Sequence, residues 1–233
     1  MAPRPNALIV GASRGIGLGL VRELARRDWS VTGTARDLDT APELAALAAG
    51  SGGQVRTAIV DIADAASAAA LRDSLETETF DLIMINAGVG GPPDKTTRTV
   101  SNDEFTRLFI TNALAPVRTA ELLVKSATPQ TGVIAFTTSL LGSVEGAGAG
   151  GFDLYRGSKA ALNSMTRSFA ARHKDKGLAV LSLHPGWVKT DMGGPAAPVS
   201  VDDSVRGLVD VVERARADRR DGYFDYTGTT LAW

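Results

Sequence analysis

The sequence predicts an α/β fold built on a doubly wound parallel sheet of about seven strands flanked by helices, and two observations carry this prediction. Short apolar runs alternate with helix-compatible segments, and clusters of glycine follow several of the runs. Most runs are apolar at every position, which is typical of strands buried on both faces. Alternating strands and helices favour right-handed βαβ units. Because one α/β domain of this size is routine, we expect residues 1–233 to form a single domain.

The first half of the chain contains four apolar runs, each followed by a helical segment. We expect strands at 7–10, 31–34, 55–60 and 82–85, and helices at 15–28, 41–49, 64–78 and 101–126. Glycines follow the first and fourth runs, as expected where strands end. The alanine-rich stretch 61–75 needs no function, because alanine is the best helix former.

The second half continues the alternation. We expect strands at 133–136 and 178–183, helices at 155–175 and 201–218, and an aromatic edge strand at 222–226. Five glycines lie within 142–151, between a strand and a helix, so this loop is expected to be flexible. Residues 227–233 would form a short tail.

Composition excludes several classes of protein. The 25 basic and 26 acidic residues leave a net charge of -1, which gives no electrostatic basis for binding nucleic acid. The chain has no cysteine, which excludes disulfides, a thiolate nucleophile and cysteine metal sites. No apolar run approaches the 18 or so residues that a membrane span requires, and no export signal is visible, so we expect a cytoplasmic protein. His173 and His184 lie too far apart for a metal site, and no metal is expected.

A glycine motif follows the first predicted strand. Gly11, Gly15 and Gly17 have the spacing GxxxGxG between a strand and a helix. This arrangement suits a pyrophosphate, which would bind at the helix N-terminus. An ordinary tight turn is the alternative, since three glycines prove little alone.

The end of the second strand favours NADP(H) over NAD(H). Sites specific for NAD place an acid there, whereas this chain has Ala35 followed by Arg36. Together with Arg14 in the glycine loop, Arg36 would meet a 2′-phosphate through charge-assisted hydrogen bonds. Alternatively, both arginines are simply solvated, and the neighbouring Asp37 would partly neutralise Arg36.

Polar residues follow other predicted strands. Asp61 would accept a hydrogen bond from the adenine amino group, and Asn86 would either contact the cofactor or stabilise the strand ends. Tyr155 and Lys159 are four residues apart and therefore project from one helix face. A nearby cation favours the phenolate, which would move the tyrosine pKa from about 10 toward a range useful for acid/base chemistry.

These motifs together resemble those of the classical short-chain dehydrogenase/reductase family. The resemblance covers nearly the whole chain and rests on Gly11–Gly17, Asn86-Ala87-Gly88, Asn112, Ser139, Tyr155 with Lys159, and Pro185-Gly186. It implies a Rossmann fold and nicotinamide-dependent oxidoreduction. The short segment after Gly186 and the sequence of 155–163 are similar to the C-factor/sniffer-type branch, whose members resemble carbonyl reductases.

The resemblance also implies roles for individual residues. Tyr155 would donate a proton to the substrate carbonyl oxygen, and Lys159 would lower the pKa of that tyrosine and hold the nicotinamide ribose. Ser139 would hydrogen-bond the same oxygen, and Asn112 would anchor a water that relays protons to Lys159. Alternatively, Ser139 caps a strand end, Asn112 is a polar residue within a helix, and Thr190 caps a helix. The full set of expected cofactor contacts is Gly11, Ser13, Arg14, Gly15, Ile16, Gly17, Arg36, Asp61, Ile62, Asn86, Ala87, Gly88, Tyr155, Lys159, Pro185, Gly186, Val188 and Thr190.

The sequence departs from the family pattern at two positions. Val10 stands where many relatives have threonine, and Ile85 replaces an asparagine, so we expect altered local hydrogen bonds. The interval from Ser139 to Tyr155 is longer than is common. Candidate walls of an open substrate pocket are Leu140, Leu141, Val144, Trp187 and Met192.

The leading hypothesis is an NADPH-dependent carbonyl reductase that acts on a ketone or aldehyde of moderate size and runs reversibly as an alcohol dehydrogenase. The alternative is a dinucleotide-binding regulatory or signalling protein with the same fold and no significant turnover. Relatives usually form dimers or tetramers through long helices, so a homodimer or homotetramer is expected.

Overall fold

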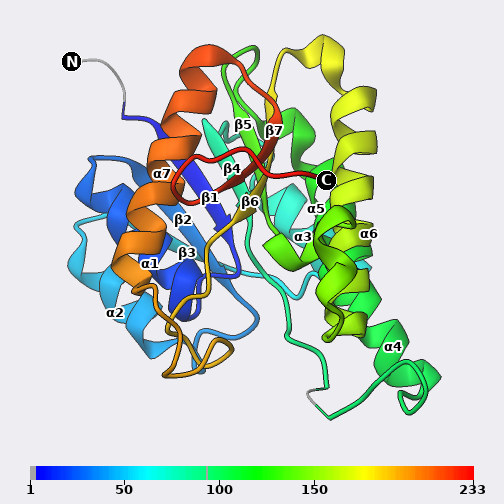
Figure 1. Cartoon of the computed structure of the whole chain (residues 1–233). Helices are drawn as coiled ribbons and strands as arrows, with labels where there is room; N and C mark the ends of the chain where they lie inside the picture. Colours follow the sequence, from blue (N-terminus) through cyan, green and yellow to red (C-terminus); the bar gives the residue numbers. More distant parts are fainter. Residues whose placement is uncertain (1–3, 93) are drawn as a thin grey trace.

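All seven strands belong to one parallel sheet in the order β3-β2-β1-β4-β5-β6-β7 (Figure 1). The computed structural model describes residues 4–92 and 94–233. The strands are β1 Asn6–Val10, β2 Ser30–Ala35, β3 Val55–Ile59, β4 Leu82–Ile85, β5 Val133–Thr137, β6 Ala179–His184 and β7 Gly222–Asp225. Every neighbouring pair is parallel, including the edge strand β7 on β6. The predicted fold class is therefore confirmed.

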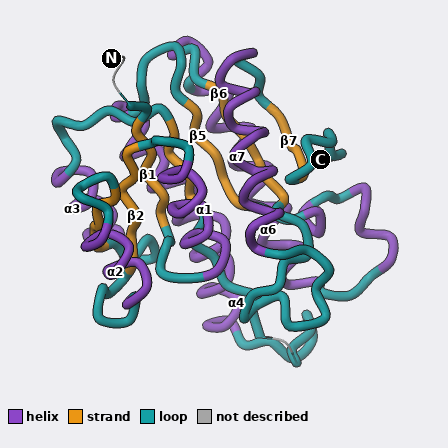
Figure 2. The backbone as a smooth tube through the Cα atoms, turned by 90° about the vertical axis from the view of Figure 1, so that its left-hand side faces the viewer, coloured by secondary structure: helices purple, strands orange, loops and turns teal. Residues whose placement is uncertain are grey.

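Helices cover both faces of this sheet (Figures 1 and 2). They are α1 Gly15–Arg26, α2 Pro42–Gly50, α3 Ala65–Ser74, α4 Asn102–Phe109, α5 Ala115–Leu123, α6 Asp153–Arg172 and α7 Val201–Asp218. Helices α1, α2 and α7 share one apolar cluster with the sheet, whereas α3, α5 and α6 share a second. None of the helices in the part of the chain that the structure describes is long and apolar enough to cross a membrane.

The central strand β1 shows why its sequence is apolar at consecutive positions. Ala7 and Ile9 belong to the cluster under α1 and α7, and Leu8 and Val10 belong to the cluster on the other face. All four side chains are fully buried. Successive strand residues point to opposite faces, so only a strand covered on both sides needs such a run.

The predicted helix 101–126 is interrupted, which is a correction to the sequence analysis. Helix α4 passes into a π-helical segment, Ile110–Leu114, before α5 begins, and a 3-10 turn, Val124–Ser126, follows α5. Pro116 explains the break, because proline has no N–H to donate to the carbonyl of Asn112, four residues earlier. The helical hydrogen-bonding pattern changes at Asn112 as a result.

Other boundaries differ by a few residues. Helix α3 ends at Ser74 rather than near residue 78, and α6 begins at Asp153, two residues before its predicted start. Tyr155 therefore lies within the first turn of α6. The tail 227–233 returns along β7, where the Leu231 N–H donates to the Tyr223 carbonyl.

A cluster of charges joins α1 to α7. Glu23 accepts hydrogen bonds from Arg26 and Arg27, and Arg27 also contacts Asp210 and Glu213 of α7 at 2.7 Å each. The Glu23 side chain is only 10% exposed. Its hydrogen bond with Arg26, supported by Arg27 and opposed by burial, lowers the pKa of Glu23 from 4.5 to about 2.

The Glu23→Gln variant should therefore lose about 1 to 2 kcal/mol of unfolding free energy at neutral pH, after allowance for screening by solvent. Because the folded-state pKa lies below the unfolded one, this stabilisation exists above pH 4.5 and disappears as the pH falls toward about 2. Denaturant unfolding across this range measures the difference between variant and parent. The control is Glu43→Gln, since Glu43 forms an exposed pair with Arg22; a loss as large in the control would contradict the prediction.

Candidate active site

The glycine loop leads into the start of α1, which has no capping side chain. Arg14 occupies the N-cap without a capping side chain, and the first turn of α1 contains no acid. Gly11 and Gly15 have positive φ values of 89° and 55°. A Cβ on Gly17 would lie 2.0 Å from the Gly11 carbonyl oxygen, so only glycine fits there. The backbone N–H groups of this turn are thus directed at a space that suits a phosphate.

A chain of hydrogen bonds links this loop to the predicted acid/base pair. The Asn86 side chain donates to the Gly11 carbonyl at 2.8 Å and accepts from the Thr137 hydroxyl at 3.0 Å. Lys159 Nζ donates to the Thr137 carbonyl at 3.0 Å. Asn86 therefore joins the ends of β1, β4 and β5, which favours the strand-stabilising interpretation of this residue.

Tyr155 and Lys159 lie together near the ends of β4 and β5. Lys159 is 4% exposed, and its Nζ lies 5.8 Å from the centroid of the Tyr155 ring. Burial lowers the pKa of Lys159 to about 8. Burial also raises the pKa of Tyr155, and a hydrogen bond with Ser139 opposes this rise. The sequence led us to expect a lowered pKa for Tyr155, whereas the structure gives a raised one, because loss of hydration outweighs the hydrogen bond. The phenol therefore keeps its proton at neutral pH.

The Ser139 side chain caps the turn that follows β5, which agrees with the capping alternative considered from the sequence. Its hydroxyl oxygen accepts from the Leu141 N–H at 3.2 Å and so caps the 3-10 turn Leu140–Gly142. The same side chain hydrogen-bonds Tyr155. Ser139 is 8% exposed, so little water competes for its hydroxyl.

The Asn112 side chain is fully used within the protein. Its amide exchanges two hydrogen bonds of 2.8 Å with the backbone of Val89 and also donates to Ser158. A Cβ on Gly88 would lie 3.3 Å from the Asn112 amide oxygen and 3.5 Å from Lys159 Nζ, so these predicted residues converge. Any water held by Asn112 would bind its backbone carbonyl, because Pro116, four residues later, has no N–H to donate to that oxygen.

The segment after β6 faces the glycine loop. A Cβ on Gly15 would lie 3.4 Å from a methyl of Thr190, whose hydroxyl accepts from the Gly193 N–H at 3.1 Å and so caps a turn rather than a helix. The Pro185 carbonyl accepts from the buried Ser204 hydroxyl at 2.6 Å, and Gly186 has φ +85°. Val188 is buried and pairs with Val199.

The two arginines expected near a 2′-phosphate are exposed. Arg14 lies 3.5 Å from Asp191, which belongs to the loop opposite. Asp37 accepts a hydrogen bond from the Asp39 N–H and forms no ion pair with Arg36 among the described residues. The Ala35 side chain is buried at the end of β2. Two cations and no carboxylate of β2 therefore border this position.

Asp61 and Ile62, which follow β3, differ from each other in their surroundings. The Asp61 carboxylate is partly buried and accepts from the Ala63 N–H at 2.9 Å. The Ile62 side chain packs in the core, and its carbonyl accepts from Arg118 at 2.9 Å. Contact between Ile62 and a cofactor would therefore involve its remaining backbone atoms.

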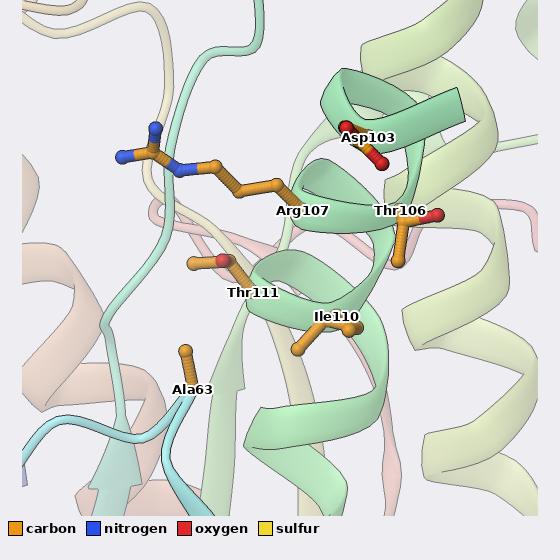
Figure 3. Close-up of a pocket in the computed structure, with 6 residues that line it drawn as sticks. All are labelled: Ala63, Asp103, Thr106, Arg107, Ile110 and Thr111. Carbon is orange, nitrogen blue, oxygen red and sulfur yellow. The ribbon is translucent and has the colours of Figure 1, made fainter. Parts of the chain in front are cut away.

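A cavity of about 310 Å³ adjoins the Asp61 loop (Figure 3). Ala63 faces Thr111 across it, and the Arg107 side chain extends over its edge. Its lining is Ala63, Asp103, Thr106, Arg107, Ile110 and Thr111. The helix residues were not predicted from the sequence, although their separations of three and four positions place them on one helix face.

The side chains predicted as pocket walls, which we call the apolar rim, are mostly exposed. Leu140, Val144, Trp187 and Met192 are between 47% and 71% exposed, and Leu141 is partly buried. Phe152, which is 75% exposed at the start of α6, was not predicted. The glycine-rich loop contains a 3-10 turn, Glu145–Ala149, and Arg156 donates to the Gly151 carbonyl at 2.9 Å.

The two departures from the family pattern have a common explanation. Val10 and Ile85 are both buried and pack in the same apolar cluster. A hydrogen bond from the Gly11 N–H to the Thr34 hydroxyl, 3.0 Å long, fastens the start of the glycine loop instead.

This sheet, with an uncapped glycine-rich helix start and a partly buried tyrosine beside a buried lysine, defines a dinucleotide-binding oxidoreductase of the Rossmann type. Residues 5–198 match the family model described as short chain dehydrogenase. The chain belongs to this family.

Similar proteins carry the comparison further. The C-signal of Myxococcus xanthus is 38% identical over 158 residues, which cover 67% of this chain and 95% of that protein. A protein of Burkholderia multivorans, assigned to the short-chain dehydrogenases/reductases and crystallised with bound NADP, is 43% identical with a TM-score of 0.95, over 99% of this chain and 100% of that one. The carbonyl reductase Sniffer of Drosophila melanogaster is 30% identical with a TM-score of 0.91, over 99% and 100%. The predicted resemblance to the C-factor/sniffer-type branch is confirmed.

The hydrogen-bond chain through Asn86 can be tested with two adjacent threonines. Thr137→Val removes the donor to the Asn86 amide oxygen and should cost about 1 to 3 kcal/mol of unfolding free energy. The Thr138 hydroxyl is buried without a hydrogen-bond partner in the described structure, so Thr138→Val should be neutral or stabilising. Denaturant unfolding compares the two variants. Equal losses of unfolding free energy would show that the hydrogen bond from Thr137 to Asn86 contributes no extra stability.

Proposed function

We propose that this protein reduces a ketone or aldehyde to an alcohol with NADPH, reversibly, and that residues 1–233 act as one NADP(H)-binding oxidoreductase domain. One observation carries the proposal: the partly buried Tyr155 and the buried Lys159 lie with Ser139 near the carboxyl ends of the strands, where the glycine loop also begins. In open parallel sheets, ligands bind at the carboxyl ends of the strands.

The choice of NADP(H) rests on charge. Arg36 is exposed directly after β2, which ends in Ala35 and carries no acid there, and Arg14 is exposed in the glycine loop, so both would be available to a 2′-phosphate. A similar protein was crystallised with NADP. The glycine loop would hold the pyrophosphate, the 61–62 segment the adenine, and Pro185–Thr190 the nicotinamide. The bound reduced nicotinamide supplies the hydride.

The protein's own residues would manage the proton. Tyr155 keeps its proton at neutral pH and therefore can donate it to the carbonyl oxygen, while the Ser139 hydroxyl stabilises charge on that oxygen. Lys159, with a pKa of about 8, can exchange a proton near neutral pH and would also bind the ribose hydroxyls. The Asn112 carbonyl is a candidate anchor for a water leading to Lys159.

The rim suggests the substrate class. Exposed Leu140, Val144, Trp187 and Met192 favour an apolar carbonyl compound of moderate size over a charged one. As the family resemblance implies, we further propose a homodimer or homotetramer, and we propose a cytoplasmic location because the sequence shows no export signal.

A second candidate function is dinucleotide-dependent signalling or regulation without significant turnover. The similarity to C-signal favours it, because that relative is named as a signal. The complete set of Ser139, Tyr155 and Lys159 supports catalysis instead, since a binding module needs no tyrosine beside a buried lysine.

Tyr155→Phe should lower the turnover of NADPH with carbonyl substrates at least about 100-fold, because it removes the proton donor. A panel of ketones, followed by NADPH absorbance, measures the loss. NADPH binding by the variant, measured by fluorescence, should be nearly unchanged. Equal activity of variant and parent would contradict the mechanism, and no turnover by either would favour signalling.

Arg36→Ala should raise the KM for NADPH by about 3- to 30-fold and leave the KM for NADH almost unchanged, since only NADPH carries the 2′-phosphate. Steady-state kinetics with both cofactors tests this. Arg72→Ala removes the same charge from α3 and should alter neither value. A parent enzyme that prefers NADH would refute the assignment.

A further inference from the structure

Tyr223 is buried although it belongs to the edge strand β7. Its side chain is 1% exposed, and it is among the largest fully buried side chains of the described residues. β7 lies beside β6 with Tyr223 opposite Ser182. A tyrosine hydroxyl buried in this way requires a hydrogen-bond partner.

The Tyr223 hydroxyl finds that partner in the segment that carries Ser139. It donates to the Ser139 carbonyl oxygen, across 84 positions of sequence. Asn163 of α6 lies near the same hydroxyl and donates to the Gly142 carbonyl at 3.3 Å. Burial raises the pKa of Tyr223 to about 12, so this phenol remains a donor at any working pH.

The backbone carbonyl of Ser139 accepts two hydrogen bonds. Its carbonyl accepts from the Gly142 N–H at 2.7 Å as well as from Tyr223. The first of these bonds lies within the turn itself and only shapes it locally. The second connects the turn to the sheet and therefore determines where the Ser139 hydroxyl stands relative to Tyr155.

The C-terminal residue supports the same arrangement. The rings of Trp233 and Tyr223 lie 5.2 Å apart, and Arg167 of α6 lies 5.2 Å from the Trp233 ring (Figure 1 shows the C-terminus beside α6). The backbone oxygen of Trp233 accepts from the Val144 N–H at 3.1 Å. The tail thus packs Tyr223 in place and fastens the start of the glycine-rich loop.

We infer that Tyr223 is a positioning residue, which acts through the Ser139 carbonyl to direct the Ser139 hydroxyl toward Tyr155 and the substrate oxygen. This inference rests on the proposed function of the same site. Tyr223 contacts neither the substrate nor the cofactor in this role. Its hydroxyl group matters, beyond the packing of its ring.

Tyr223→Phe keeps the ring and removes only the donor. It should lower kcat about 2- to 13-fold, as the loss of one hydrogen bond implies, and leave the KM and the dissociation constant for NADPH unchanged. In the direction of alcohol oxidation, the pKa seen in the pH profile of kcat should rise in this variant. The reason is that the Ser139 hydrogen bond, which lowers the pKa of Tyr155, would be weakened. A purely structural role would not move that pH profile.

A double-mutant cycle separates positioning from a general effect. In a Ser139→Ala background, Tyr223→Phe should have little further effect on kcat, since the group that it positions is gone. The control is Ser182→Ala, which removes a neighbouring buried hydroxyl that has no partner in the described structure, and which should change neither kcat nor the pH profile. Additive effects of Tyr223→Phe and Ser139→Ala would overturn the inference.

A readout independent of turnover distinguishes this inference from the proposed function. With isotope-labelled tyrosine, the Cζ resonance of Tyr155, assigned with Tyr155→Phe, should shift in the same direction in Tyr223→Phe and Ser139→Ala. An inactive parent enzyme would refute the proposed function, whereas an unchanged Tyr155 resonance in folded Tyr223→Phe would refute positioning even if the parent is active.

Discussion

The site depends on the hydrogen bonds that run from the Gly11 carbonyl through Asn86 and Thr137 to Lys159. These bonds join the ends of three strands to one helix, so they determine how far the acid/base pair stands from the phosphate loop. Each is short and only partly exposed. Because an unsatisfied buried polar group is costly, the whole chain must form together or be lost together. The position of Lys159 is thus a property of the sheet as well as of its own helix.

Burial has opposite effects on the pKa values of the two central residues. It raises the pKa of Tyr155 and lowers that of Lys159, because a medium of low polarity penalises both the phenolate and the ammonium. Both groups therefore move toward their neutral forms. A neutral phenol is the form that carbonyl reduction requires, and a lysine with a pKa of about 8 can pass a proton without leaving the site.

Much of the fold and of the site follows from local sequence. The strand positions could be predicted because burial on both faces demands consecutive apolar residues, as in β1. The Tyr155–Lys159 pair could be predicted because four residues make one helical turn. The interruption at Ile110–Leu114 was missed, although Pro116 was a visible sign of it. The helix face along the cavity and the exposed Phe152 were missed because nothing in their sequence marks them as neighbours of a site.

The sequence by itself determined the element order, the glycine turn and the identity of the groups available for acid/base chemistry, because each depends on interactions within a few residues. Only the tertiary structure decided the direction of the Tyr155 pKa, the use of the Asn112 amide by Val89, and the contact of Tyr223 with Ser139. Those features depend on burial and on partners far apart along the chain. Sequence spacing carries no information about such distances until the sheet brings the strand ends together.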